Sequence, residues 1–185
     1  MNKKFLYELT LIFVCFIGAS TLSASTMASA YVLGEGSFPQ KGVPKGKVEK
    51  HIWDKSAIYP GVVNEYWLYV PAQYKSAEPA SVMVFQDGEM YLNPDEGVQA
   101  PVVFDNLIHR REMPVTIGIF INPGMKEVRG DQRSNQYVPV NDVYAHFLIE
   151  EILPEVSRNY NLVTDASGRA IVAVSYTHLT LPTKR

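Results

Sequence analysis

The sequence predicts an α/β fold in which an antiparallel strand pair precedes a β-α-β-α-β succession. Two continuous apolar runs, Ser81–Gln86 and residues 115–122, are typical of parallel strands that are covered on both faces. Between them, residues 102–111 carry apolar side chains at helical spacing. Strand, helix and strand in this order form a βαβ unit, whose crossover is right-handed in nearly all known proteins.

Length and composition favour one globular domain. The 185 residues are 46% hydrophobic and 11% aromatic, which argues against disorder. The formal net charge is −2, and acidic and basic residues are interspersed along the chain. We therefore expect neither nucleic acid nor an anionic membrane surface as a partner. The sequence leaves the oligomeric state open.

The first thirty residues predict a signal peptide. Lys3 and Lys4 supply the positive start, residues 11–17 the apolar stretch, and residues 28–30 (Ala-Ser-Ala) a cleavage site. A membrane anchor is the alternative, but the apolar stretch is short for a bilayer core of about 30 Å. Export makes the protein periplasmic or secreted. Because the only cysteine, Cys15, lies in this segment, the mature chain has no thiol for disulfides, zinc or catalysis.

The strand pair follows a short leader. Residues 31–47 contain four glycines and two prolines, which predicts a flexible leader before the fold. Residues 48–53 and Asn64–Val70 show alternating or aromatic-rich patterns that are typical of strands. The turn signal Tyr-Pro-Gly at 59–61 separates them, so we expect an antiparallel hairpin.

The clearest helix in the sequence covers residues 141–160. Asn141 is suited to cap its start. Five apolar residues make a stripe along it: Val143, Phe147, Leu148, Ile152 and Val156. Pro154 removes a backbone hydrogen bond and costs about 3 kcal/mol in a regular helix interior, so we expect the helix to bend or restart there rather than run straight. A turn at 165–168 then leads into another apolar strand that begins at Arg169.

The candidate chemistry lies directly after the strand Ser81–Gln86. Reaction sites of such sheets collect at the carboxyl ends of parallel strands. Gly88 allows a sharp turn, so the backbone N–H of Glu89 is suited to bind a developing oxyanion. The alternative is a simple strand-ending turn in which Asp87 caps neighbouring N–H groups, and an isolated Asp-Gly pair favours this alternative.

A longer set of motifs extends this interpretation. In order, they are Y-W-L-Y-V-P-A-Q-Y (66–74), V-M-V-F-Q-D-G (82–88), V-V-F-D-N-L-I (102–108), E-M-P-V-T-I-G-I-F-I-N-P-G (112–124) and F-L-I-E-E-I-L-P-E-V (147–156). Together they closely resemble the esterase D and enterochelin-esterase-like family of α/β hydrolases. The resemblance implies the N-terminal portion of an α/β-hydrolase domain at residues 48–173. It also implies a Ser-His-Asp/Glu hydrolase without cofactor or metal, whose oxyanion hole uses the Asp87–Gly88 loop and the Glu89 N–H.

The nucleophile of this family sits on a Gly-x-Ser-x-Gly elbow after a strand that begins Arg-Ala-Ile. Here that strand begins at Arg169, and the elbow register places Ser175 at the nucleophile position. Both glycines are absent, and Cβ atoms at these positions obstruct the tight packing of an elbow. The alternative for Ser175 is an ordinary polar residue. The acid and the base of the triad are missing from the chain.

The end of the chain has a second unusual feature. The string V-S-Y-T-H-L-T-L-P-T (174–183) resembles the translation of a sequencing-library adapter. We therefore expect residues 174–185 to be a non-native tail. On this hypothesis His178 is no catalytic base, and Ser175 matches the register by accident.

Other polar residues predict no separate site. His51, His109 and His146 lack the spacings of metal ligands. The tripeptide Arg-Gly-Asp at 129–131 is interpreted as an exposed loop. Residues 123–138, with Arg133 among them, follow a strand at its carboxyl end, so they either line a substrate entrance or form a solvated connection.

The leading functional hypothesis is a secreted or periplasmic serine carboxylic-ester hydrolase. Its expected substrate is a small-molecule or polysaccharide-linked ester, such as a siderophore, feruloyl or acetyl ester. The first alternative is a non-catalytic carbohydrate- or siderophore-binding module on the same scaffold, and the second is an acyltransferase. Without a complete triad, we expect the chain as written to be inactive.

Overall fold

A computed structural model describes residues 33–93, 98–127 and 130–173, which belong to one compact unit that begins at Leu33. Five strands form its main sheet: β1 (Lys47–Trp53), β2 (Asn64–Val70), β3 (Ser81–Gln86), β4 (Thr116–Ile121) and β7 (Arg169–Val172). Their order across the sheet is β1-β2-β4-β3-β7. The pairs β1–β2 and β2–β4 are antiparallel, whereas β3 is parallel to both β4 and β7. The predicted α/β fold, with its hairpin and parallel strands, is confirmed.

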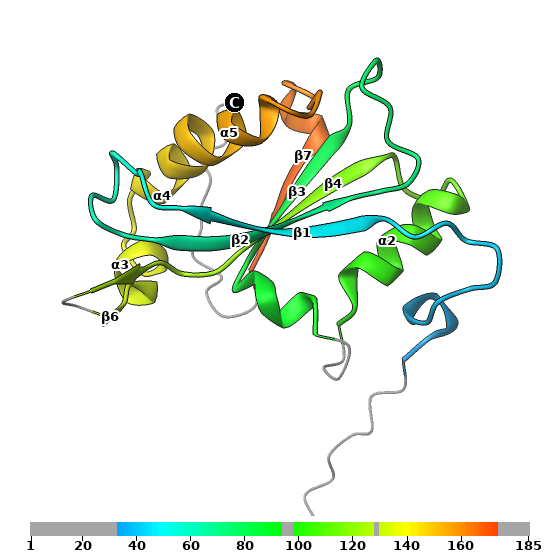
Figure 1. The fold of residues 1–185 in the computed structure, drawn as a ribbon, viewed down its shortest axis with the longest axis horizontal. Coiled ribbons are helices and arrows are strands. Elements are labelled where there is room, and N and C mark those ends of the chain that lie inside the picture. The colour runs from blue at the N-terminus through cyan, green and yellow to red at the C-terminus, as the bar shows by residue number, and fades with distance from the viewer. Residues whose placement is uncertain (1–32, 94–97, 128–129, 174–185) are drawn as a thin grey trace, which may run out of the picture. The chain divides into compact units, whose positions relative to one another are not determined.

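Helices cover both faces of this sheet. Helix α2 (Ala100–His109) lies on one side, and α4 (Val143–His146) and α5 (Leu153–Ser157) lie on the other (Figure 1). All six residues of β4 are buried, as the continuous apolar run predicts for a strand with two covered faces. Pro101 lies in the first turn of α2, where its missing N–H costs no helical hydrogen bond.

The two faces of the sheet carry separate hydrophobic clusters. On the α2 side, Tyr69, Phe85 and Phe120 pack with Phe104 and Ile108 of the helix. The opposite cluster joins alternate residues of the strands to α4, α5 and the segment between them: Leu68, Val82, Val84, Ile117, Ile119, Phe147, Ile152 and Val156. Because successive side chains of β3 and β4 point to opposite faces of the sheet, one set packs against α2 and the other against α4 and α5.

The helix predicted over 141–160 covers residues 143–157, and its hydrogen-bonding pattern changes along its length. A π-helical segment, η3 (Phe147–Ile152), separates α4 from α5, and Pro154 falls in the first turn of α5. The wider hydrogen-bonding pattern thus ends just before the proline, where a missing N–H is tolerated. Of the two expected outcomes, a bend or a restart, the structure shows the restart, since the α-helical pattern begins again at Leu153. The predicted cap at Asn141 is shifted by one residue: Asp142 is the N-cap of α4 and makes no side-chain capping bond, whereas Asn141 Oδ1 accepts from the Val143 N–H at 3.1 Å.

The segment expected as a flexible leader makes defined contacts with α2. It contains a short 3-10 turn, η1 (Glu35–Ser37). The Asn106 Nδ2 of α2 donates to the carbonyl oxygens of Gly36 and Phe38 at 2.8 and 2.9 Å. The Gly46 N–H donates to Asp105 Oδ1 at 2.7 Å, directly before β1 begins.

The remaining elements are short. They are η2 (Gly88–Tyr91), β5 (Met125–Lys126), β6 (Gly130–Asp131), α3 (Arg133–Tyr137) and η4 (Ala166–Gly168). Strands β5 and β6 pair antiparallel, so the connection after β4 contains a small hairpin and a helical turn. In the part of the chain that the structure describes, no helix has the length and apolar character needed to span a membrane. The predicted signal peptide, Ser175 and the predicted tail lie outside the described residues.

Arg111 ends α2 in a conformation that normally selects glycine. Its φ is +60°, and the Glu112 N–H donates to the Leu107 carbonyl at 2.9 Å, which is the Schellman pattern. A side chain in this left-handed region costs about 1 kcal/mol. We expect Arg111→Gly to raise the free energy of unfolding by up to about 1 kcal/mol in urea titrations. Arg110, with φ −77°, provides the control, because Arg110→Gly should lower it; an equal loss in both variants would contradict this account.

Candidate active site

The loop after β3 depends on a glycine that no other residue can replace without movement. Asp87 has φ +54°, in the left-handed region, and Gly88 then begins η2. A Cβ on Gly88 would lie 2.2 Å from the Phe120 carbonyl carbon and 2.4 Å from the Ile121 nitrogen. The loop therefore packs directly on the backbone of β4. This places the Glu89 N–H at the carboxyl edge of the two central parallel strands, where the sequence predicts it.

Arg133 holds this loop through a bidentate ion pair. Its Nε and Nη2 atoms donate to Asp87 Oδ1 and Oδ2 at 2.8 and 2.6 Å. The arginine begins α3, where its own N–H donates to Asp131 Oδ1 at 2.8 Å, and its guanidinium lies 5.8 Å from the Tyr137 ring centroid. A bidentate pair of this kind fixes the relative orientation of the two side chains in addition to pairing their charges. Arg133, from the 123–138 segment, therefore contacts the candidate site through Asp87.

The Glu89 N–H already has an acceptor in this structure. It donates to Asn122 Oδ1 at 3.1 Å, and Asn122 Nδ2 donates back to Glu89 Oε2 at 3.0 Å. Asn122 is itself positioned by β2, because its N–H donates to the Glu65 carbonyl and its carbonyl accepts from Asn64 Nδ2, both at 3.0 Å. The asparagine oxygen thus occupies the position from which a substrate oxygen would accept.

Asn122 lies within the motif at residues 112–124, but no role is predicted for it from the sequence. A signal was present: Asn122 directly follows β4, so its side chain reaches the same carboxyl edge as Asp87 and Glu89. Two of the three predicted loop residues, Asp87 and Glu89, line an open pocket of about 380 Å³ with this asparagine, together with Met90, Asn93 and Pro123. The volume lies in the range of small-molecule sites.

Two tyrosines near Asp87 remain neutral at physiological pH. Burial raises the pKa of Tyr91, and the negative charge of Asp87 adds to this effect. Burial is also the main cause that raises the pKa of Tyr137. Because their ordinary pKa is already near 10, neither phenol is a proton acceptor at neutral pH. These two phenols therefore act only as hydrogen-bond donors or neutral acceptors at this edge.

The described residues contain no group of three His, Cys, Asp or Glu side chains placed to hold a metal ion. His51 stacks on Tyr66 with ring centroids 5.1 Å apart, and His146 pairs with Glu150 at 2.6 Å on an exposed helix face. Asn135 donates to Gln132 Oε1 at 2.9 Å. Arg129, like the nucleophile candidate Ser175, lies outside the described residues.

The hydrogen bond between Glu89 and Asn122 gives a direct prediction. We expect Asn122→Ala to speed amide hydrogen exchange at Glu89 roughly fivefold, since a net hydrogen bond contributes about 1 kcal/mol. Exchange followed by NMR would measure this. Asn161→Ala is the matched control, because Asn161 donates to Tyr74 and Ser76 on a different part of the surface. Unchanged exchange at Glu89 in Asn122→Ala would show that the amide is protected in another way.

Comparison with solved structures supports the assignment of the fold. No protein-family model and no curated protein matches the sequence. A CE1 ferulic acid esterase from Anaeromyces mucronatus in complex with ferulic acid aligns at 15% identity and a TM-score of 0.58, over 78% of this chain and 54% of that chain. A mutant feruloyl esterase module from Clostridium thermocellum, complexed with sinapinate, aligns at 15% identity and a TM-score of 0.52, over 77% of this chain and 49% of that one.

These neighbours define the class of scaffold. The five-stranded mixed sheet with helices on both faces is an α/β-hydrolase fold. The predicted resemblance to an esterase family of α/β hydrolases is confirmed at the level of the fold. The chain spans about half the length of the solved structures that it matches.

Proposed function

We propose that this chain is the N-terminal portion of a secreted or periplasmic serine carboxylic-ester hydrolase. The observation that carries the proposal is the backbone N–H of Glu89, which Gly88 and the Asp87–Arg133 pair hold at the carboxyl edge of β3. An oxyanion-hole donor of this kind contributes about 3 to 4 kcal/mol to acyl transfer. The fold likeness to feruloyl esterases supports the same reaction class.

The strand order also supports the proposed position of the nucleophile. Strand β7 is parallel to β3, and Val172 is the register partner of Phe85. The carboxyl ends of the two strands therefore lie side by side. A serine that follows β7 by a few residues starts next to the Asp87–Gly88 loop, which is the geometry that an elbow nucleophile and an oxyanion donor require.

In the proposed reaction, the serine oxygen attacks the ester carbonyl and the carbonyl oxygen becomes an oxyanion. The Glu89 N–H donates to this oxyanion after the Asn122 carboxamide turns away. A histidine, oriented by an acid, accepts the serine proton and returns it to the leaving alcohol. Neither the acid nor the base is assigned in this chain. The substrate is a small-molecule or polysaccharide-linked ester, with feruloyl and acetyl esters as the first candidates.

One observation favours a non-catalytic binding module as the second candidate. Asn122 Oδ1 accepts from the Glu89 N–H and Asn122 Nδ2 donates to the Glu89 carboxylate, which is a closed arrangement rather than an open oxyanion hole. On this reading, the pocket beside Asp87 binds a polar group of a carbohydrate or siderophore without hydrolysis.

Hydrolysis of methyl ferulate and 4-nitrophenyl acetate tests the proposal. We expect no turnover above buffer for the chain as written, and none for Ser175→Ala, since the triad is incomplete. We expect turnover by the full-length product of the intact gene. Turnover by the chain as written that Ser175→Ala abolishes would overturn the fragment interpretation. An intact product that carries Gly-x-Ser-x-Gly and cleaves neither ester would favour the binding module.

A further inference from the structure

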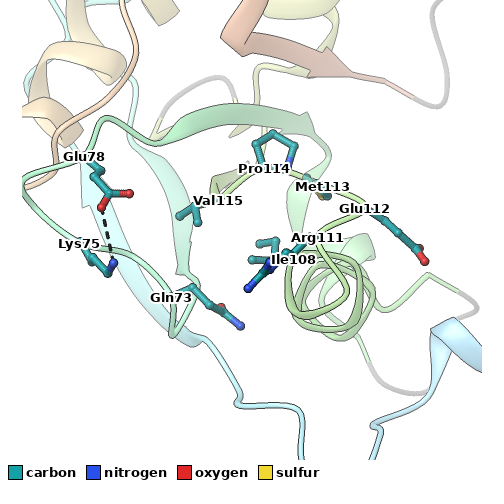
Figure 2. Close-up of a pocket in the computed structure, with 9 residues that line it drawn as sticks. All are labelled: Gln73, Lys75, Glu78, Ile108, Arg111, Glu112, Met113, Pro114 and Val115. Atoms are coloured by element: carbon teal, nitrogen blue, oxygen red, sulfur yellow. Dashed lines mark hydrogen bonds and ion pairs between the residues drawn. The ribbon is translucent and has the colours of Figure 1, made fainter.

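A cavity of about 630 Å³ lies at the end of the sheet opposite to the candidate active site. Its lining comes from the connection that precedes β3, including Gln73 and Lys75, and from the segment that precedes β4, including Arg111 and Val115 (Figure 2). These are the amino ends of the two parallel strands. Each strand has six residues, so roughly 20 Å of sheet separates this cavity from the Asp87–Gly88 loop.

The charges around the cavity leave one arginine unpaired. Lys75 pairs with Glu78 at 3.5 Å, as the dashed line in Figure 2 shows, and Glu112 pairs with Arg110 at 3.0 Å. Within the described part of the chain, the Arg111 guanidinium makes no hydrogen bond or ion pair. The cavity therefore presents a single uncompensated positive charge, carried by a side chain with five N–H donors.

Gln73 adds an unsatisfied amide to the same wall. Both its Oε1 and its Nε2 are buried and have no hydrogen-bond partner among the described residues. Buried carboxamides are normally paired, because an unpaired donor or acceptor loses its hydrogen bonds to water. An acceptor on a ligand in the cavity would satisfy Nε2 after a small rotation of the side chain.

An apolar wall lies beside the Arg111 guanidinium. Ile108 is buried, and Met113 and Val115 are half-buried.

We propose that this cavity binds a small carboxylate that carries a compact apolar body. Arg111 binds the carboxylate through its planar fork, Gln73 Nε2 donates to the same group, and the wall of Ile108, Met113 and Val115 contacts the apolar body. This site is separate from the proposed esterase site and does not depend on that function.

Titration of the purified protein with benzoate tests the proposal, with ligand-observed NMR as the readout and benzyl alcohol as the neutral probe. We expect saturable benzoate binding at millimolar concentrations or below, and at least roughly tenfold weaker binding of benzyl alcohol. Arg111→Gly should weaken benzoate binding by roughly tenfold or more while its unfolding midpoint is unchanged or raised. Gln73→Leu should weaken binding severalfold.

Arg158→Ala is the matched control, since it removes an exposed arginine on α5 that pairs with Glu155 away from the cavity. It should leave benzoate affinity unchanged. Three outcomes would each overturn the proposal: no benzoate binding, equal binding of benzyl alcohol, or equal benzoate affinity in Arg111→Gly and the wild type. Because Arg111→Gly is expected to fold at least as well as the wild type, a loss of binding cannot be attributed to unfolding.

Discussion

Replacing Gly88 by alanine is expected to lower the free energy of unfolding by about 3 kcal/mol, the upper part of the range for overpacked sites. The new Cβ would lie within 2.5 Å of three backbone atoms of Phe120 and Ile121. Backbone in a fully buried central strand moves less readily than the end of a flexible side chain. Either β4 shifts or the Asp87–Glu89 loop lifts away from the sheet.

Urea unfolding of Gly88→Ala would measure this loss. Gly34→Ala is the matched control, because nothing lies within 4 Å of a Cβ built at Gly34. Its effect should stay within about 0.5 kcal/mol. Amide exchange in the variant reports the second consequence, since displacement of the loop should also break the Glu89 hydrogen bond to Asn122. Wild-type stability in Gly88→Ala would contradict the close packing of the loop on β4.

The second large effect is expected at Glu151, which ties the β1–β2 connection to η3. Its Oε1 accepts from the Ala57 and Ile58 N–H groups at 2.8 and 3.0 Å, and its Oε2 accepts from Trp53 Nε1 at 3.0 Å. Glu151→Gln keeps the shape but removes the charge and one acceptor. We expect the free energy of unfolding to fall by about 2 kcal/mol near neutral pH, because charged hydrogen bonds are stronger than neutral ones.

The effect of Glu151 should depend on pH. Burial acts to raise the pKa of its carboxyl group, but the hydrogen bonds from Ser56, Ile58, Trp53 and Ala57 outweigh it, so the pKa is lowered from 4.5. A carboxyl with a lowered pKa in the folded state stabilises the fold above its unfolded pKa and loses this contribution as pH falls through the folded value. The difference between wild type and Glu151→Gln should therefore shrink as the pH falls below 4.5, the ordinary pKa of this carboxyl group.

Glu150→Gln is the control for this experiment, because Glu150 is adjacent and pairs only with the exposed His146. We expect it to change stability by less than about 0.5 kcal/mol. Denaturant titrations at neutral and acidic pH would measure both variants. A Glu151→Gln effect that stays constant down to acidic pH would show that shape, and not charge, holds this connection.

The sequence predicts the strands because their pattern is local. The run Ser81–Gln86 matches β3 at both ends, and the antiparallel pair follows from alternation around a Tyr-Pro-Gly turn. The position of the Asp87–Gly88 loop follows from the end of that strand. The π-helical segment η3 could not be predicted from the sequence, because its apolar stripe also fits an ordinary α-helix. Only Pro154 indicates a change in the helix.

The contacts of the site that the sequence does not predict join residues from different strands and loops. Glu89 and Asn122 are 33 residues apart, and Asp87 and Arg133 are 46 apart. No local spacing indicates which of several polar residues at the carboxyl edge will meet. The left-handed conformation of Arg111 could not be predicted from the sequence either, since glycine is the usual residue at that position.

The central claim is that this chain carries the oxyanion half of a serine ester hydrolase whose nucleophile follows β7. Sequencing across the Ala173 codon from unfragmented genomic DNA tests it most directly. We predict a Gly-x-Ser-x-Gly elbow in place of residues 173–177, with a histidine about a hundred residues further on. The same codons for residues 174–185, followed by a stop, would contradict this account and favour a non-catalytic binding module.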